Sequence, residues 1–211
     1  MKHSKETIRV VSHDPGICNY AVSVMDITFI DNAKVITSKG TVRKNLLEIK
    51  IIKSGMLTSP MNDVNLDVVS QNRTYCAEIQ RILNKYQPDI VCAERFQNRG
   101  FRAGGVQIEA VNMMLGALAS LPQFDTRELK LVSPMVWKSA LKKRHDLKGE
   151  YKKCRFPVHE LDAALIGIYG AHILTKRKPF VDYELDMNDL HAQIILSTKS
   201  PVKKLKEKKN A

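Results

Sequence analysis

Three acidic side chains and one histidine occupy positions where they could hold metal ions together. Asp14 follows one apolar run of the chain and Glu94 follows another. His159 precedes Asp162 by three residues, and residues three apart share one face of a helix. Acids beside apolar runs are costly to bury unless they are paired or bound to a cation. We therefore expect Asp14, Glu94, His159 and Asp162 to converge on one site.

The chemistry of this set is that of a divalent metal centre. Carboxylate oxygens with one imidazole suit Mg²⁺ or Mn²⁺. Two such ions activate a water molecule and stabilise the leaving oxygen in phosphodiester hydrolysis. We expect Mg²⁺, with Mn²⁺ as a substitute and two ions per active site. The candidate metal ligands and catalytic residues are Asp14, Glu94, His159 and Asp162.

Each of these residues also has a structural alternative. Asp14 precedes a Pro-Gly pair and could serve only as a turn former. Glu94 could form a surface ion pair, and His159 could stand at a helix N-terminus without binding a ligand. Asp162 lies among apolar neighbours, which argues against a solvated helix face. The combination of all four carries more information than any one of them.

The elements that position these residues follow from the apolar pattern. Strands are expected at 8–13, 20–25, 33–42, 90–93 and 129–132. Helices are expected at 69–86, at 106–121, from Ser133-Pro134 onward, and from Pro157 to about Leu174. The first two strands form a hairpin around Asp14. Segment 46–52 fits either a strand or a short helix. This order predicts an α/β layer fold with a mixed sheet.

The composition points to a polyanionic partner. Of the 211 residues, 34 are Lys or Arg and 22 are Asp or Glu, so the formal net charge is +12. Nucleic acid is the commonest partner of so basic a chain, whereas 6% aromatic residues argue against a base-stacking module. No apolar run approaches the ~20 residues of a membrane span, so we expect no membrane contact.

The cysteines indicate the compartment. No two of them form a Cys-x-x-Cys pair, which argues against a zinc ribbon, and the apolar surroundings of Cys18, Cys76 and Cys92 suit buried thiols. We expect a cytoplasmic protein, in the host cytoplasm if it is encoded by a phage. The four are Cys18, Cys76, Cys92 and Cys154.

Basic residues near the acidic positions are the candidate DNA contacts. A Gly-rich loop after Glu94 carries three arginines, and a lysine follows the Ser-Pro helix start. Segment 142–155 carries a basic cluster, which is expected to be a phosphate-contact loop. A local ion pair for the first arginine and an exposed helix position for the lysine are the alternatives. The candidates are Arg95, Arg99, Arg102, Lys138, Lys142, Lys143 and Arg144.

Three motifs together resemble the RuvC-like Holliday-junction resolvases, over about residues 7–175. They are Asp14-Pro15-Gly16, Glu94 after Ile90-Val91-Cys92-Ala93, and His159-Glu160-Leu161-Asp162-Ala163. The turn from Asp14 to Ala21 and the segment from Glu94 to Arg99 are closest to the mitochondrial, poxviral and phage branch. Bacterial RuvC places an aromatic wedge three residues after its Glu, a position that is Gln97 here, next to Phe96. Both are therefore candidate DNA contacts.

The resemblance implies a ribonuclease-H-like fold, with a five-stranded mixed sheet of three antiparallel and then two parallel strands. It also implies a homodimer whose two active sites, using Mg²⁺ or Mn²⁺, each nick one of two like-polarity strands of a four-way DNA junction. The nuclease domain would span 1–175, followed by an appended segment, 176–198, and a basic tail without fixed structure, 199–211.

Other functions remain open on the sequence alone. An RNA-processing nuclease of the same fold and a non-catalytic nucleic-acid-binding protein are the two alternatives, although four ligand-type residues argue against the second. A sugar or acetate kinase of the actin-like type is excluded, because that fold needs a duplicated domain and 211 residues are too few.

Overall fold

The computed structural model describes residues 5–16, 19–58, 68–95, 105–124, 128–153, 158–177 and 183–198. The strands are β1 (Lys5–Asp14), β2 (Asn19–Thr37), β3 (Gly40–Thr58), β4 (Ile90–Glu94) and β5 (Leu129–Val132). The helices are α1 (Val68–Tyr86), α2 (Gly105–Ala119), the short 3₁₀ helix η1 (Pro122–Phe124), α3 (Pro134–Lys142), α4 (Leu147–Lys153), α5 (Val158–Leu174) and α6 (Met187–Thr198).

All five strands belong to one mixed sheet, in the order β3-β2-β1-β4-β5. The pairs β1–β2 and β2–β3 are antiparallel, whereas β4 lies parallel to β1 and β5 parallel to β4. The predicted α/β class and the predicted series of three antiparallel and then two parallel strands are therefore confirmed. β1 and β4 read as apolar runs because both faces of a central strand are covered.

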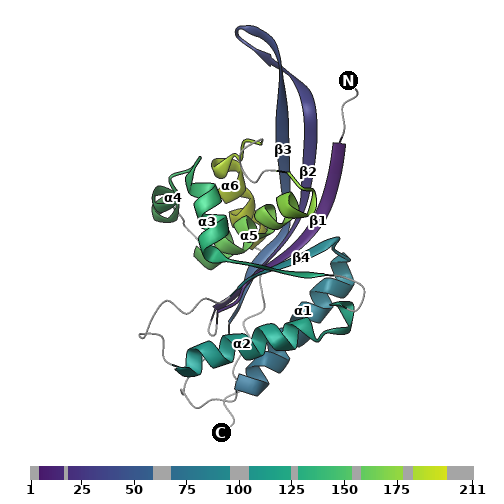
Figure 1. Ribbon diagram of the computed structural model, residues 1–211, viewed down its shortest axis with the longest axis vertical. Coiled ribbons are helices and arrows are strands. Elements are labelled where there is room, and N and C mark those ends of the chain that lie inside the picture. The colour runs from purple at the N-terminus through teal and green to yellow at the C-terminus, as the bar shows by residue number, and fades with distance from the viewer. Residues whose placement is uncertain are drawn as a thin grey trace.

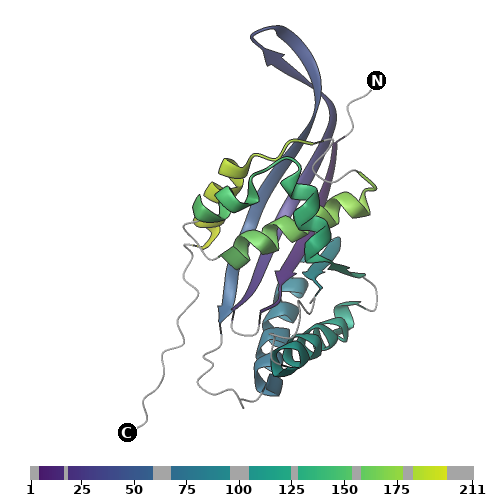
Figure 2. The same cartoon turned by 60° about the vertical axis from the view of Figure 1, so that its left-hand side comes forward.

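Helices cover both faces of the sheet and create two apolar cores (Figures 1 and 2). On one face α5 and α6 pack on the strands, with α3 beside them; Leu165, Trp137 and Ile194 belong to this core. On the other face α1 and α2 cover the strands, with Ile79 and Leu118 in the core. The catalytic candidates on α5 therefore come from a helix that packs directly on the sheet.

The second and third strands differ from the expectation in length and in the position of the turn between them. A third strand over 33–42 was expected, and this is wrong, because β2 runs on to Thr37 and the chain turns at Ser38-Lys39 into β3. Gly40 follows the turn with φ +116°, a conformation that glycine adopts without strain. Segment 46–52 is part of β3, so its strand alternative is the correct one.

The C-terminal part of the described chain adds one helix that the apolar pattern did not indicate. In α6, Leu190 and Ile194 enter the same core as α5. Gln193 accepts a hydrogen bond from the backbone N–H of Ile51 and donates one to the carbonyl of Ile49, both at 2.8 Å. The side chain thus continues the hydrogen-bond ladder at the outer edge of β3. Among the described residues, no helix is both long and apolar enough to cross a membrane.

Candidate active site

The sheet brings Asp14 and Glu94 to adjoining strand ends. His13 of β1 lies opposite Ala93 of the parallel strand β4, so the acids that follow them are neighbours at the same edge of the sheet. Asp14 is almost buried, with 8% of its surface exposed. The turn after it requires Gly16, because a Cβ there would lie 2.4 Å from the carbonyl oxygen of Asn19. The predicted convergence of these two acids is observed.

Helix α5 adds the remaining two predicted residues. His159 Nδ1 lies 2.6 Å from Asp14 Oδ2, although the two residues are 145 positions apart in the chain. This hydrogen bond raises the pKa of His159 above its ordinary value, with the charge of Asp14 adding to the effect and partial burial opposing it. Asp162, one turn further along the helix, is buried to 7% exposure. Because the two side chains bond to each other, Asp14 is more than a turn former, and His159 is more than a residue at a helix N-terminus.

Small side chains allow α5 to approach the sheet closely enough for this. A Cβ on Gly167 would lie 2.6 Å from Ser12 Oγ, and one on Gly170 would lie 2.0 Å from Cys92 Sγ. The hydroxyl of Ser12 also donates a 2.6 Å hydrogen bond to the carbonyl of Ala163. These contacts fix α5 against β1 and β4, and thereby fix Asp162 against the strand-end acids.

Burial and the charges of neighbouring carboxylates disfavour the ionised forms of Glu94 and Asp162. Burial first, and then the negative charge of Asp14, raise the pKa of Glu94 to about 7. Burial also raises the pKa of Asp162 against the lowering effect of Lys138. Acids whose ionised forms are disfavoured in this way gain from a nearby divalent cation. Glu94 is not a surface ion-pair residue, because its hydrogen bond is to a buried partner.

That partner is one of two side chains that the sequence analysis missed. Trp137 on α3 is fully buried, and its Nε1–H donates a 3.0 Å hydrogen bond to Glu94 Oε2. Tyr151 on α4 donates from its hydroxyl to Asp162 Oδ1 at 2.5 Å. Neither has a local sequence signal, because each bond joins separate elements. The nearest signal is the position of Trp137 beside Lys138, one turn after the Ser-Pro helix start.

Lys138 lies at the site rather than on an exposed helix face. Its Nζ is 3.0 Å from Asp162 Oδ2 and 4.8 Å from the centre of the Trp137 ring. Only 25% of the side chain is exposed, so the alternative of a plain solvated lysine is wrong. Asp162 is therefore held from two sides, by a phenol on one oxygen and by an ammonium on the other.

The donor set fits a divalent cation. Three carboxylates and an imidazole supply hard oxygen donors and one nitrogen. Within the described ranges, no three His, Cys, Asp or Glu side chains are already gathered tightly enough to enclose an ion. Binding of an ion would therefore require these side chains to draw closer together.

The other predicted DNA contacts are placed only in part. Lys142, Lys143 and Arg144 are exposed, and Arg95 is exposed with its backbone N–H bonded to the carbonyl of Val132. No acid among the described residues pairs with Arg95. Phe96, Gln97, Arg99 and Arg102 lie outside the described residues.

The basic segment 142–155 is not simply a loop, because it contains α4, whose residue Leu147 anchors the helix in the core.

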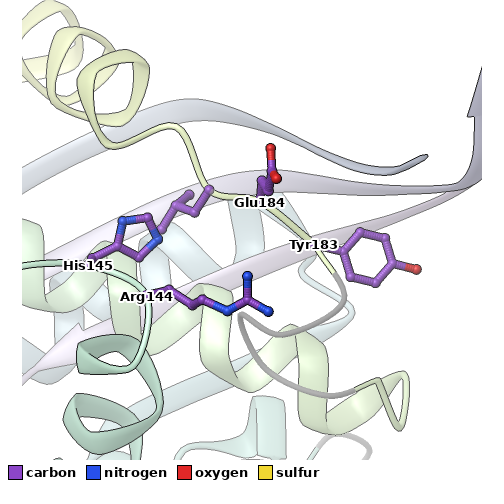
Figure 3. Close-up of a pocket in the computed structure, with 5 residues that line it drawn as sticks. Arg144, His145, Tyr183 and Glu184 are labelled. Atoms are coloured by element: carbon purple, nitrogen blue, oxygen red, sulfur yellow. The ribbon is translucent and has the colours of Figure 1, made fainter. Parts of the chain in front are cut away.

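Arg144 lies at a cavity of about 290 Å³ (Figure 3). The other lining residues are His145, Tyr183, Glu184 and Leu185. This cavity contains none of the four candidate metal ligands.

Comparison with known proteins places the fold. No protein-family model and no curated protein matches the chain. RuvC of Thermus thermophilus matches with a TM-score of 0.57 at 16% identity, over 82% of this chain and 99% of that one. The same protein in complex with a Holliday junction substrate matches with a TM-score of 0.56 at 16% identity, over 80% of this chain and 96% of that one. Ydc2, the yeast mitochondrial Holliday junction resolvase, matches with a TM-score of 0.46 at 18% identity, over 76% of both chains. The order of strands in the sheet and the two RuvC matches show that the chain has the ribonuclease-H-like fold in the form found in RuvC.

Proposed function

We propose that this chain is a metal-dependent, structure-selective DNA endonuclease that resolves four-way junctions by paired nicks. The observation that carries the proposal is the meeting of Asp14, Glu94 and Asp162, with His159 bonded to Asp14, at one edge of the sheet. The fold supports it, since a protein of similar fold has been solved in complex with a Holliday junction substrate. The excess of positive charge suits a DNA partner.

We assign the ligand role to Asp14, Glu94, His159 and Asp162, with Mg²⁺ as the ion, Mn²⁺ as a substitute and two ions per site. Bound ions of this kind activate water and stabilise the leaving oxygen of a phosphodiester. The chain's own contribution is to keep the acids oriented. Asp14 is held by Nδ1 of the His159 imidazole, which leaves Nε2 as the ring nitrogen that would bind an ion.

Positive side chains around the acids provide the affinity for DNA. Lys138 lies beside Asp162, and a quarter of its side chain is exposed. Its ammonium would therefore be able to neutralise a phosphate bound at the site. The exposed residues Lys142, Lys143, Arg144 and Arg95 would contact the backbone of the flanking duplex. Such contacts set register and affinity without reading base sequence.

Paired nicking requires two sites, so we propose a homodimer. A two-fold axis would relate two sites to the two like-polarity strands of a junction. On α2, Met113 exposes 44% of its surface beside Asn112 and Gly116, which are also exposed. An exposed methionine on an apolar helix suits a helix-to-helix contact with a second copy.

The test is cleavage of a mobile four-way junction, with a linear duplex and an RNA–DNA hybrid as comparisons, with and without Mg²⁺. We expect junction nicking only with the ion, and its loss in Asp14→Asn, Glu94→Gln and Asp162→Asn with junction binding retained. The matched control is Glu160→Gln, because this carboxylate lies on the same helix but bonds to Ser54 and not to the site.

Full cleavage by any of the three variants would remove that residue from the site. Preference for the hybrid over the junction would favour the RNA-processing alternative, and binding without any cleavage would favour a non-catalytic nucleic-acid-binding protein.

A further inference from the structure

The hairpin of β2 and β3 extends beyond the rest of the molecule as a two-stranded ribbon (Figures 1 and 2). Within the described chain, pairing of β1 with β2 ends at Lys5 opposite Ile30. At the outer edge of β3, Leu46 forms an isolated bridge with Glu184. From Ala33 to the turn, β2 and β3 pair with each other and with no other described strand.

The ribbon leaves the sheet at a defined irregularity. The register of β2 and β3 shifts between Ile30 and Ala33. Asn32 adopts φ 54°, and its backbone N–H donates a 3.0 Å hydrogen bond to Asn45 Oδ1. A bulge of this kind bends a strand and increases its twist. The ribbon therefore has a fixed departure point and is not a loosely attached loop.

Its charges all have one sign. Segment 33–45 contains no Asp or Glu, and its basic side chains are all exposed. Lys34 stands directly opposite Arg43, a pairing of like charges that costs stability in a sheet. The four basic residues of the ribbon are Lys34, Lys39, Arg43 and Lys44.

The acids near the base of the ribbon do not neutralise it. Asp31 is engaged by Arg177, and Glu48 lies in an ion pair with Lys5. Across the described ranges, none of the ribbon's four basic side chains forms an ion pair. The molecule thus extends an arm of uncompensated positive charge.

We propose that the ribbon of residues 33–45 is a DNA-binding arm that contacts the phosphate backbone of a duplex away from the cleavage site. This inference rests on the proposed function, because the duplex is an arm of the branched substrate. A two-stranded ribbon fits the major groove of B-DNA. Lys34 and Arg43 face one side of this ribbon and Lys44 the other, which suits the phosphates on the two walls of a groove.

The reach of the arm sets the distance from the scissile site. Asp14 and Lys5 are the two ends of the ten-residue strand β1, about 30 Å apart at about 3.3 Å per residue. The five rungs from Ala33 to Thr37 add on the order of 15 Å. The contacted duplex would then lie about 10 base pairs or more from the crossover, at about 3.4 Å per base pair.

A charge-removal variant with a charge-keeping control tests this. The first replaces Lys34, Lys39, Arg43 and Lys44 with Gln, and the second exchanges each Lys for Arg and Arg43 for Lys. Binding is measured in EDTA, so that no cleavage occurs, on junctions with arms of about 25 or about 8 base pairs. Circular dichroism follows folding; because the like-charge pair is removed, the Gln variant should melt no lower than the unaltered chain.

We expect the Gln variant to bind the long-armed junction at least about tenfold more weakly and its salt slope to fall by about 2 to 3.5, near 0.9 for each lost phosphate contact. The charge-keeping variant should bind like the unaltered chain. On the short-armed junction the two variants should differ much less.

Equal affinity of the Gln variant and the unaltered chain for the long-armed junction would overturn the inference. Aggregation of the Gln variant with unchanged DNA affinity would also overturn it, since the lysines would then only protect exposed strands from pairing. Because no step here depends on cleavage, ribbon-dependent duplex binding by a chain that nicks no junction would support the arm while contradicting the proposed nuclease.

Discussion

The indole of Trp137 shows how a buried side chain outside the sheet can orient a residue that we propose as a metal ligand. Its ring is fully buried, and its one polar atom donates to Glu94. Partners that hold metal ligands in place in this way commonly contribute 10- to 100-fold to metal affinity, as an order of magnitude. Trp137 is also the only tryptophan of the chain.

We therefore predict that Trp137→Phe, which keeps an aromatic ring but loses the donor, weakens Mn²⁺ binding by about 10- to 100-fold. Calorimetric titration measures this in the variant, which has no tryptophan. In the unaltered chain, tryptophan fluorescence should respond to Mn²⁺, and Glu94→Gln should abolish the response. Unchanged Mn²⁺ affinity in Trp137→Phe would show that the indole only fills space.

His13 makes a second prediction at this scale, on stability rather than on catalysis. It is fully buried against the ring of Tyr20, and no described residue makes a hydrogen bond to either ring nitrogen. Burial lowers its pKa from 6.5 to about 3. Below pH 6.5 the unfolded chain takes up a proton that the folded chain refuses, so this histidine lowers stability as the pH falls.

Between pH 7 and pH 5 the contribution is about 2 kcal/mol, from about 1.4 kcal/mol per unit below the unfolded pKa. His13→Leu should remove it, so the free energy of unfolding should fall less steeply in the variant by that amount. Urea unfolding at both pH values measures the difference. Comparing the variant with the parent cancels the contributions of the buried acids, and parallel pH dependence of the two proteins would contradict the prediction.

At the scale of elements, the close approach of α5 to the sheet depends on Gly167 and Gly170, where any side chain would meet the strands. We predict that Gly170→Ala lowers the free energy of unfolding by about 1–3 kcal/mol through overpacking, although alanine favours helices. The Cβ would lie 2.0 Å from Cys92 Sγ, so Cys92→Ala should restore part of the loss. Chemical unfolding of the two single variants and the double variant measures the coupling. Additive effects would show that the strain arises elsewhere.

The elements that sequence reasoning predicted well are those with a strong local signal. Strand β5 was expected at 129–132, where it is observed, because a short apolar run is bounded by polar residues and a Ser-Pro helix start. The helix expected at 69–86 is α1, whose apolar residues recur with a helical period. The candidate ligands could be predicted because they adjoin or lie within apolar segments of this kind. They are Asp14, Glu94, His159 and Asp162.

What the sequence did not reveal depends on partners far along the chain. The β2–β3 hairpin exceeds its predicted strands because its outer half has no core that would impose alternation, and so gives no burial pattern. Trp137 and Glu94 are 43 positions apart, and only the docking of α3 on the sheet joins them. Helix α6 was missed because much of its surface is exposed, so its core contacts leave a weak pattern.

At the scale of the whole molecule, the proposed dimer gives a prediction that couples assembly to the pattern of cuts. Met113→Asp on the exposed face of α2 should yield monomers by light scattering, because a carboxylate would be buried at the contact. Such monomers should still nick a junction, but the two cuts should become independent events. A cruciform plasmid separates these outcomes, since paired cuts linearise it and single cuts only relax it. A dimeric Met113→Asp protein would exclude this face of α2.

The bond between His159 and Asp14 spans 145 positions of the chain. Helix α5, which carries His159, also supplies a large part of one apolar core. During synthesis, the segments that carry Asp14 and Glu94 are made before α5, so a chain without α5 would lack His159, Asp162 and the covering of one sheet face. Under the proposed function, cleavage of DNA would therefore have to wait until α5 has been made and has packed on the sheet.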